Sequence, residues 1–100
     1  MHFDSTSNKS QASGLTTYYY SRKKDFRLAQ TIHQHLQKLA LPDRGVFSED
    51  YEVTRENEQP AILIEGGYIN NPKDFKKINS PQYREQLAEA IYQGLVQYFK

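Results

Sequence analysis

The stretch Pro60-Ala61-Ile62-Leu63-Ile64-Glu65-Gly66-Gly67-Tyr68 decides the fold expected of this chain. Its apolar residues have no polar face, which is typical of a central strand covered on both sides of a sheet. A buried carboxylate is costly without a partner, so we expect Glu65 at the carboxyl end of this strand, beside a cleft, a metal ion or an opposite charge. Gly66 and Gly67 would let the backbone turn sharply there and let a ligand come close.

The composition bounds the class of protein. One hundred residues form at most one small domain, which buries roughly two-thirds of the surface of its unfolded chain. Thirteen basic and twelve acidic residues give a net charge of +1, so no global field favours nucleic acid or an anionic membrane. The absence of cysteine excludes disulfides and thiolate metal sites. No apolar stretch approaches the ~20 residues of a membrane span, and residues 1–10 lack the apolar core of an export signal.

The first half of the chain has two clear elements. Residues 15–20 are dense in β-branched and aromatic types and predict a strand. Residues 24–40 predict an amphipathic helix, which the proline and glycine within residues 41–45 would end. Residues 4–14 are small and polar and predict a flexible loop. The helix pattern rests on residues at spacings of three and four: Phe26, Ala29, Ile32, His33, Leu36 and Leu39.

The second half begins with a weak signal and ends with a strong one. Residues 51–53 give a faint strand pattern, expected to be a short edge piece. Asn71 predicts a helix cap, with Pro72 at the first position and Asp74 reaching back as in a capping box. That turn should end by residue 79. Residues 80 and 81 repeat the cap-plus-proline signal before a long final helix, whose predicted buried stripe is Tyr83, Leu87, Ala88, Ile91, Leu95 and Phe99.

The order of strand, helix, weak strand, strand and helix is that of an α/β fold. Two apolar-striped helices and a strand covered on both sides need a sheet of at least about four strands. The patterns predict only two convincing strands, at residues 15–20 and around residues 61–64. We therefore expect a sheet that these residues supply only in part.

Histidine is the usual nitrogen ligand of zinc, and the chain has His2, His33 and His35. His33 and His35 are two residues apart on the predicted helix, which separates them by roughly 200° around its axis, so they cannot both coordinate one ion. We expect both on the helix surface or at the edge of the core. His2 precedes the polar loop, where a strand end could present it as a ligand, although a histidine at such a position is usually part of a terminus without a role.

Two other interpretations compete with a metal site. The tyrosines of residues 18–20 followed by Arg22, Lys23 and Lys24 could stack and neutralise single-stranded nucleic acid. Alternate tyrosines of a strand face opposite sides, however, and a lysine-rich helix start is usually a solvated face, so we expect no nucleic-acid binding. The Glu65 carboxylate could instead cap a helix or pair with Arg44 or Arg55. The chain has no phosphate-binding glycine loop and no Ser-His-Asp order.

Taken together, the segments resemble the C-terminal half of the zinc-dependent N-acetylmuramoyl-L-alanine amidases, the bacterial cell-wall hydrolase family called amidase 3. The resemblance starts at the residues His2-Phe3-Asp4, similar to a Ser-Ile-His-x-Asn/Asp element of the family, and covers nearly all 100 residues. Order and spacing agree along the chain. The remaining motifs that carry it are Gly14-Leu15-Thr16-Thr17-Tyr18-Tyr19-Tyr20, Leu28-Ala29, Asp43-Arg44-Gly45-Val46, residues 60–72 and residues 90–98.

The resemblance implies an α/β fold with a mixed sheet flanked by helices, of which residues 1–100 form the C-terminal part of a single catalytic domain. It also implies roles for two residues. His2 matches the last of three zinc ligands, and Glu65 matches the glutamate that works beside the metal as general base and acid. The bond cut would join N-acetylmuramic acid to the L-alanine of the peptidoglycan stem peptide, with one zinc ion per complete domain.

The first two ligands of the family, a histidine in an Asp-Pro-Gly-His-Gly-Gly loop and a glutamate about one helix later, have no counterpart in these residues. We therefore expect a truncated chain that is inactive alone, since a catalytic zinc site needs three protein ligands. It could associate with itself through an unpaired sheet edge. The alternative is a non-catalytic module that binds cell wall or protein. The family places the parent enzyme outside the membrane, although this chain carries no export signal.

Overall fold

The computed structural model describes residues 2–4 and 12–100, with side chains for residues 12–100. Most of the predicted polar loop lies outside the described residues. In chain order the elements are β1 (His2–Asp4), β2 (Leu15–Tyr19), α1 (Arg22–Leu36), β3 (Asp43–Ser48), α2 (Glu52–Arg55), β4 (Leu63–Tyr68), α3 (Pro72–Ile78) and α4 (Pro81–Tyr98). No helix of the described residues is both long enough and apolar enough to cross a membrane.

The strands form one four-stranded sheet in the order β1-β4-β2-β3. β4 is parallel to β1 and antiparallel to β2, and β2 is parallel to β3. The predicted mixed sheet is therefore confirmed, and the described residues supply more of it than the two strands that the sequence patterns indicate. β1 and β3 are its outer strands, so either could offer an edge for association, which stays a prediction.

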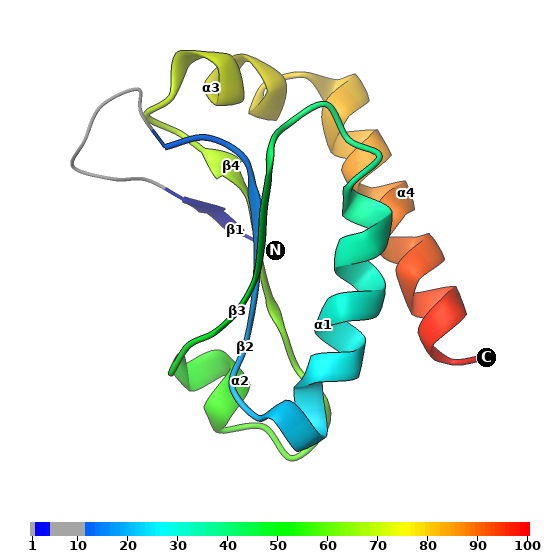
Figure 1. The fold of residues 1–100 in the computed structure, drawn as a ribbon. Helices are drawn as coiled ribbons and strands as arrows, with labels where there is room; N and C mark the ends of the chain where they lie inside the picture. The colour runs from blue at the N-terminus through cyan, green and yellow to red at the C-terminus, as the bar shows by residue number, and fades with distance from the viewer. Residues whose placement is uncertain (1, 5–11) are drawn as a thin grey trace.

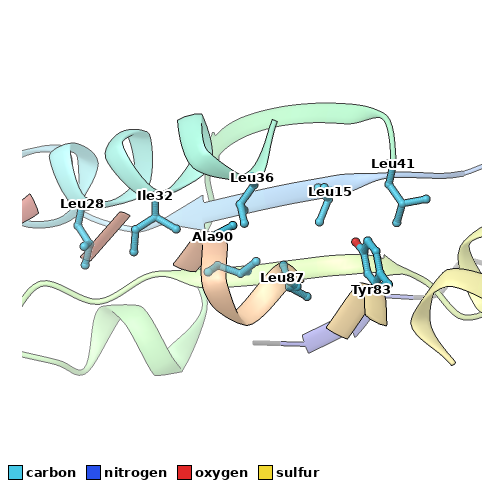
Figure 2. Packing of buried hydrophobic residues seen from close by; sticks show 9 residues of the cluster. Leu15, Leu28, Ile32, Leu36, Leu41, Tyr83, Leu87 and Ala90 are labelled. Atoms are coloured by element: carbon cyan, nitrogen blue, oxygen red, sulfur yellow. The ribbon is translucent and has the colours of Figure 1, made fainter. Parts of the chain in front are cut away.

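Helices α1 and α4 lie on the same side of the sheet and pack against each other (Figure 1). Figure 2 shows α1 and α4 side chains meeting over β2 and β4 in a single apolar core. This core confirms the amphipathic helix predicted at residues 24–40, although the helix runs over Arg22–Leu36 and ends four residues before the predicted end. Its buried members are Leu15, Leu28, Ile32, Leu36, Leu41, Ile64, Tyr83, Leu87 and Ala90.

The helix starts predicted at Asn71 and Ser80 are confirmed by their caps, and α1 starts two residues before the predicted position, after a cap at Ser21. The Ser21 hydroxyl accepts a hydrogen bond from the backbone N–H of Lys24, and the Ser80 hydroxyl accepts one from that of Tyr83. The Asn71 side chain accepts from two backbone N–H groups in the first turn of α3. These bonds satisfy donors that a helix start otherwise leaves without partners. The capping-box role predicted for Asp74 is wrong, because the backbone N–H of Asn71 donates to the Tyr68 carbonyl, and the Asp74 carboxylate accepts from Gly14, just before β2, and from Tyr68 of β4.

The prediction for the middle of the chain was wrong in two places. Residues 43–45, expected only to end a helix, open strand β3, which pairs in parallel with β2. Residues 51–53, expected to form an edge strand, lead into helix α2. The Tyr51 ring packs edge-on against Tyr18 at 5.3 Å, and the turn buries Thr54 completely. Packing against Tyr18 therefore explains Tyr51, whereas Val53 is 62% exposed.

The stripe predicted for α4 is correct only in its first turns. Ala88 is exposed, and Phe99 is 78% exposed. The buried residues are instead Tyr83, Leu87, Ala90 and Gly94. At Gly94 the helix comes so close to α1 that an added Cβ would lie 2.9 Å from the Cα of Ile32. Small residues make this crossing possible, and their close contact decides which face of α4 is buried.

Candidate functional site

Glu65 lies in the middle of β4 and not at its carboxyl end, which corrects the sequence-based prediction. The strand runs on through Gly66 and Gly67 to Tyr68. Gly67 has a φ of +135°, a conformation that favours glycine, and the register between β1 and β4 shifts beside it. The glycines therefore form an irregular strand segment and not a turn. Glu65 is held on both sides by neighbouring strands.

The register of the sheet gives Glu65 its neighbours. In β1 it is paired with His2, and in β2 it is paired with Thr16. Neighbouring strands lie about 4.8 Å apart, so the two residues predicted to act at the site, His2 and Glu65, have adjacent backbones. The structure thus brings together the two residues that the resemblance singled out, from β1 and β4.

The Glu65 side chain faces away from the α1 and α4 layer. Its neighbour Ile64 belongs to the core between sheet and helices, and successive side chains of a strand point to opposite faces. Ile64 and Glu65 are 6% and 5% exposed, so β4 is buried on both faces, as predicted. A carboxylate in such a place has lost most of its contact with water, a state usually found only with partner charges or hydrogen-bond donors.

The backbone around Glu65 is anchored from the helix layer. The Tyr83 hydroxyl, on α4, donates a hydrogen bond of 3.1 Å to the carbonyl of Gly66, the residue after Glu65. Burial, together with the nearby negative charge of Asp74, raises the pKa of Tyr83 to about 12. The phenol therefore stays protonated and able to donate throughout the neutral range.

Asp74 ties together the strand ends near Glu65. Its carboxylate accepts hydrogen bonds from the Ser13 hydroxyl at 2.6 Å and from the backbone N–H groups of Gly14 and Tyr68, both at 2.9 Å. It joins the start of β2 to the end of β4 from its place on α3. This role of Asp74 could not be predicted from the sequence, because a capping-box spacing gives no sign of donors so far away in the chain.

Asp25 likewise connects distant chain segments, at the opposite end of the sheet. Its buried carboxylate accepts from the backbone N–H groups of Ser21 and Ala61 and pairs with the Lys24 ammonium at 2.7 Å. Burial alone would raise the pKa of Asp25, but the Lys24 contact and the backbone donors outweigh it and lower that pKa. The connection leading into β4 is thereby fixed to the start of α1.

The other two histidines do not lie with Glu65. His33 is buried beneath the sheet, with Nδ1 2.8 Å from the Thr17 hydroxyl and Nε2 2.5 Å from Asp43. His35 contacts Gln97 on α4 at 2.7 Å. The expectation that both histidines lie on the helix surface or at the edge of the core is wrong for His33, which is 3% exposed because its two ring nitrogens contact Thr17 and Asp43.

The arginines proposed as partners of Glu65 have contacts of their own. Arg55 bonds to Asp50 and Glu56, and the Arg44 guanidinium lies 5.1 Å from the ring centre of Tyr68. Among the residues that the structure describes, no three His, Asp or Glu side chains gather closely enough to hold a metal ion. The paired positions of β1 and β4 carry a histidine, the usual nitrogen ligand of zinc, and a glutamate, a side chain that can act as a general base.

The fold and the paired positions define the class of protein. A sequence model of the N-acetylmuramoyl-L-alanine amidases matches residues 1–97, and the chain belongs to this family. It is 42% identical over 93 residues to the probable cell wall amidase LytH of Staphylococcus epidermidis. The matched region covers 92% of this chain and 32% of LytH.

Solved structures of the family share the fold. The amidase AmiC2 of Nostoc punctiforme superposes on this chain with a TM-score of 0.91 and 31% sequence identity. An N-acetylmuramoyl-L-alanine amidase of Clostridium difficile 630 superposes with a TM-score of 0.89 and 36% sequence identity. Each comparison covers 97% of this chain and 54% of the solved chain. The chain thus spans about half of those structures and about a third of LytH.

Proposed function

We propose that these residues are part of a zinc-dependent peptidoglycan amidase that cuts the bond between N-acetylmuramic acid and the L-alanine of the stem peptide. The observation that carries the proposal is the backbone pairing of His2 with Glu65 across β1 and β4. Membership of the amidase family and the identity to a cell wall amidase support it. The enzyme would act on the cell wall, outside the membrane.

His2 would supply one of the zinc ligands through its imidazole. When bound, zinc would polarise the amide carbonyl and lower the pKa of its water toward ~7. Glu65 would accept a proton from the attacking water and deliver it to the nitrogen of the departing L-alanine. Each turnover would then return Glu65 to its charged form. Because β4 is bonded to a strand on each side, the backbone that carries this carboxylate is held in place.

A catalytic zinc site takes three protein ligands, and the proposal assigns one of them to this chain. We therefore expect the other two from residues outside these 100, and we expect the 100 residues alone not to hydrolyse muramoyl peptides. Hydrolysis by the isolated chain that is lost in Glu65→Gln would contradict this part of the proposal.

The test uses the full product of the gene, loaded with zinc and freed of excess metal. We expect His2→Ala to lose bound zinc and activity, while His35→Ala, which changes a histidine bound to Gln97, keeps both. Glu65→Gln should keep its zinc but lower kcat on a muramoyl peptide by roughly 10²- to 10⁴-fold, the usual contribution of a general base. Wild-type kcat in Glu65→Gln, or full zinc in His2→Ala, would overturn the assignment.

The same experiment decides the alternative of a non-catalytic module. A full gene product that binds muramoyl peptides without cutting them, with or without zinc, would support that alternative. Hydrolysis that depends on Glu65 would exclude it.

A further inference from the structure

Thr16 is a buried residue whose hydroxyl has no hydrogen-bond partner in the described structure. The residue is 1% exposed, and Oγ1 is one of only two such side-chain atoms among the described residues. Buried polar groups are nearly always bonded, so an exception needs an explanation. Valine has the same shape and suits a strand at least as well, so packing alone does not account for a threonine here.

The hydroxyl of the neighbouring Thr17 has a hydrogen-bond partner, as most buried hydroxyls do. Its hydroxyl lies 2.8 Å from Nδ1 of His33 on α1, which places the Thr17 side chain on the helix-covered face of the sheet. Because successive residues of a strand alternate, Thr16 faces the opposite side. Two threonines that are adjacent in the chain therefore differ in one respect, since only the first has an unpartnered hydroxyl.

The sheet register shows what the Thr16 hydroxyl can reach. Thr16 is paired with Glu65 on one side and with Gly45 on the other. Glycine has no side chain, so Glu65 is the one cross-strand partner on this face with a polar side chain. Side chains at directly paired positions of antiparallel strands have Cβ atoms about 5 Å apart, and a glutamate has enough rotatable bonds to bring its carboxylate to a neighbouring hydroxyl.

We propose that Thr16 is a positioning residue for Glu65, whose hydroxyl donates a hydrogen bond to the carboxylate when Glu65 takes its working orientation. The hydroxyl is buried, so a substrate does not reach it directly, whereas Glu65 lies beside it in the sheet. The inference rests on the proposed role of Glu65 as general base. It explains why a buried strand position on this face carries a hydroxyl that makes no hydrogen bond in the described structure.

The test compares the same substitution at the two adjacent threonines in the zinc-loaded full gene product. We expect Thr16→Val to lower kcat roughly 10- to 100-fold, as misplaced catalytic groups do, with KM, zinc content and Tm maintained or Tm raised. Thr16→Ser keeps the hydroxyl and should retain most of kcat. Thr17→Val should show the reverse pattern, a lower Tm with kcat preserved, because it leaves the buried Nδ1 of His33 without its Thr17 partner.

Two outcomes would overturn the inference: a wild-type kcat in Thr16→Val, or a fall in its Tm like that of Thr17→Val. A crystal structure of the zinc-loaded protein gives a readout independent of activity. The inference requires Thr16 Oγ1 within about 3 Å of a Glu65 carboxylate oxygen, and a longer separation contradicts it. If the wild-type protein cuts no amide, the proposed function fails, and this distance together with the Tm values still decides the role of Thr16.

Discussion

The carboxylate of Asp74 accepts a hydrogen bond of 2.9 Å from the backbone N–H of Gly14, a residue 60 positions earlier in the chain. The bond connects helix α3 to the start of β2. The backbone N–H of Tyr68 donates to the same carboxylate oxygen and the Ser13 hydroxyl donates to the other, so that three chain segments meet at Asp74. This junction holds the sheet together next to the proposed site.

Asp74→Asn should lower the free energy of unfolding by about 2–4 kcal/mol. The amide retains the shape of the carboxylate but loses its charge and turns an N–H₂ group toward groups that are themselves donors. Urea unfolding at neutral pH measures the loss. Asp50→Asn, at a side chain 62% exposed and paired with Arg55, is the matched control and should cost less than about 1 kcal/mol. Equal effects of the two changes would refute the role given to Asp74.

Acid should destabilise the chain partly through Asp25. Its pKa is lowered in the fold from the ordinary value of 3.8, so the folded state favours the charged form. The stability that this provides is present above about pH 4 and is lost as the pH falls through the folded pKa. In Asp25→Asn this component is absent, so the unfolding free energy should fall less steeply below pH 4. An unchanged slope would count against the prediction.

Alkali should act through Tyr83. Its pKa is raised to about 12, while a tyrosine in the unfolded chain ionises near 10. The folded state therefore holds its proton longer, and stability should decline as the pH rises from about 10 toward 12. Tyr83→Phe removes this decline and costs about 1 kcal/mol at neutral pH through the lost bond to Gly66. Unfolding midpoints of both proteins between pH 8 and 11, on either side of the unfolded pKa, measure the difference.

Gly94→Ala should destabilise the chain even though alanine favours helix by about 1 kcal/mol over glycine. The new Cβ would lie 2.9 Å from both Cα and Cγ1 of Ile32, so α1 and α4 would have to separate. Overpacking of this kind typically costs about 1–3 kcal/mol. Gln86→Ala on the exposed face of α4 should have little effect. A higher Tm for Gly94→Ala would show that the helices adjust freely.

The sequence predicted the elements whose signals are local. Strand β2 and helix α1 follow from residue type and spacing, and the starts of α3 and α4 follow from Asn71 and Ser80 with the proline after each. These features depend on residues within one or two turns of each other. The family was likewise predicted correctly from its motifs.

The predictions that were wrong concern features decided by distant contacts. Gly66 and Gly67 suggested a turn, but pairing with β1 and β2 extends β4 through them. The strand β3 contains a glycine and few apolar residues, and it forms because β2 offers it a parallel partner. Thr16 could not be told from its neighbour Thr17 by sequence, since only the register shows which of them lies beside Glu65.

The parallel pairing of β1 with β4 also determines when the site can assemble during protein synthesis. His2 leaves the ribosome ahead of every other element described, yet its partner strand begins only at Leu63. Contacts between such distant segments form late, because a long loop must close before they contribute any stability. The two residues proposed to act together are therefore brought side by side only after most of the chain has been made, and a nascent chain that stops before β4 carries His2 without its neighbour.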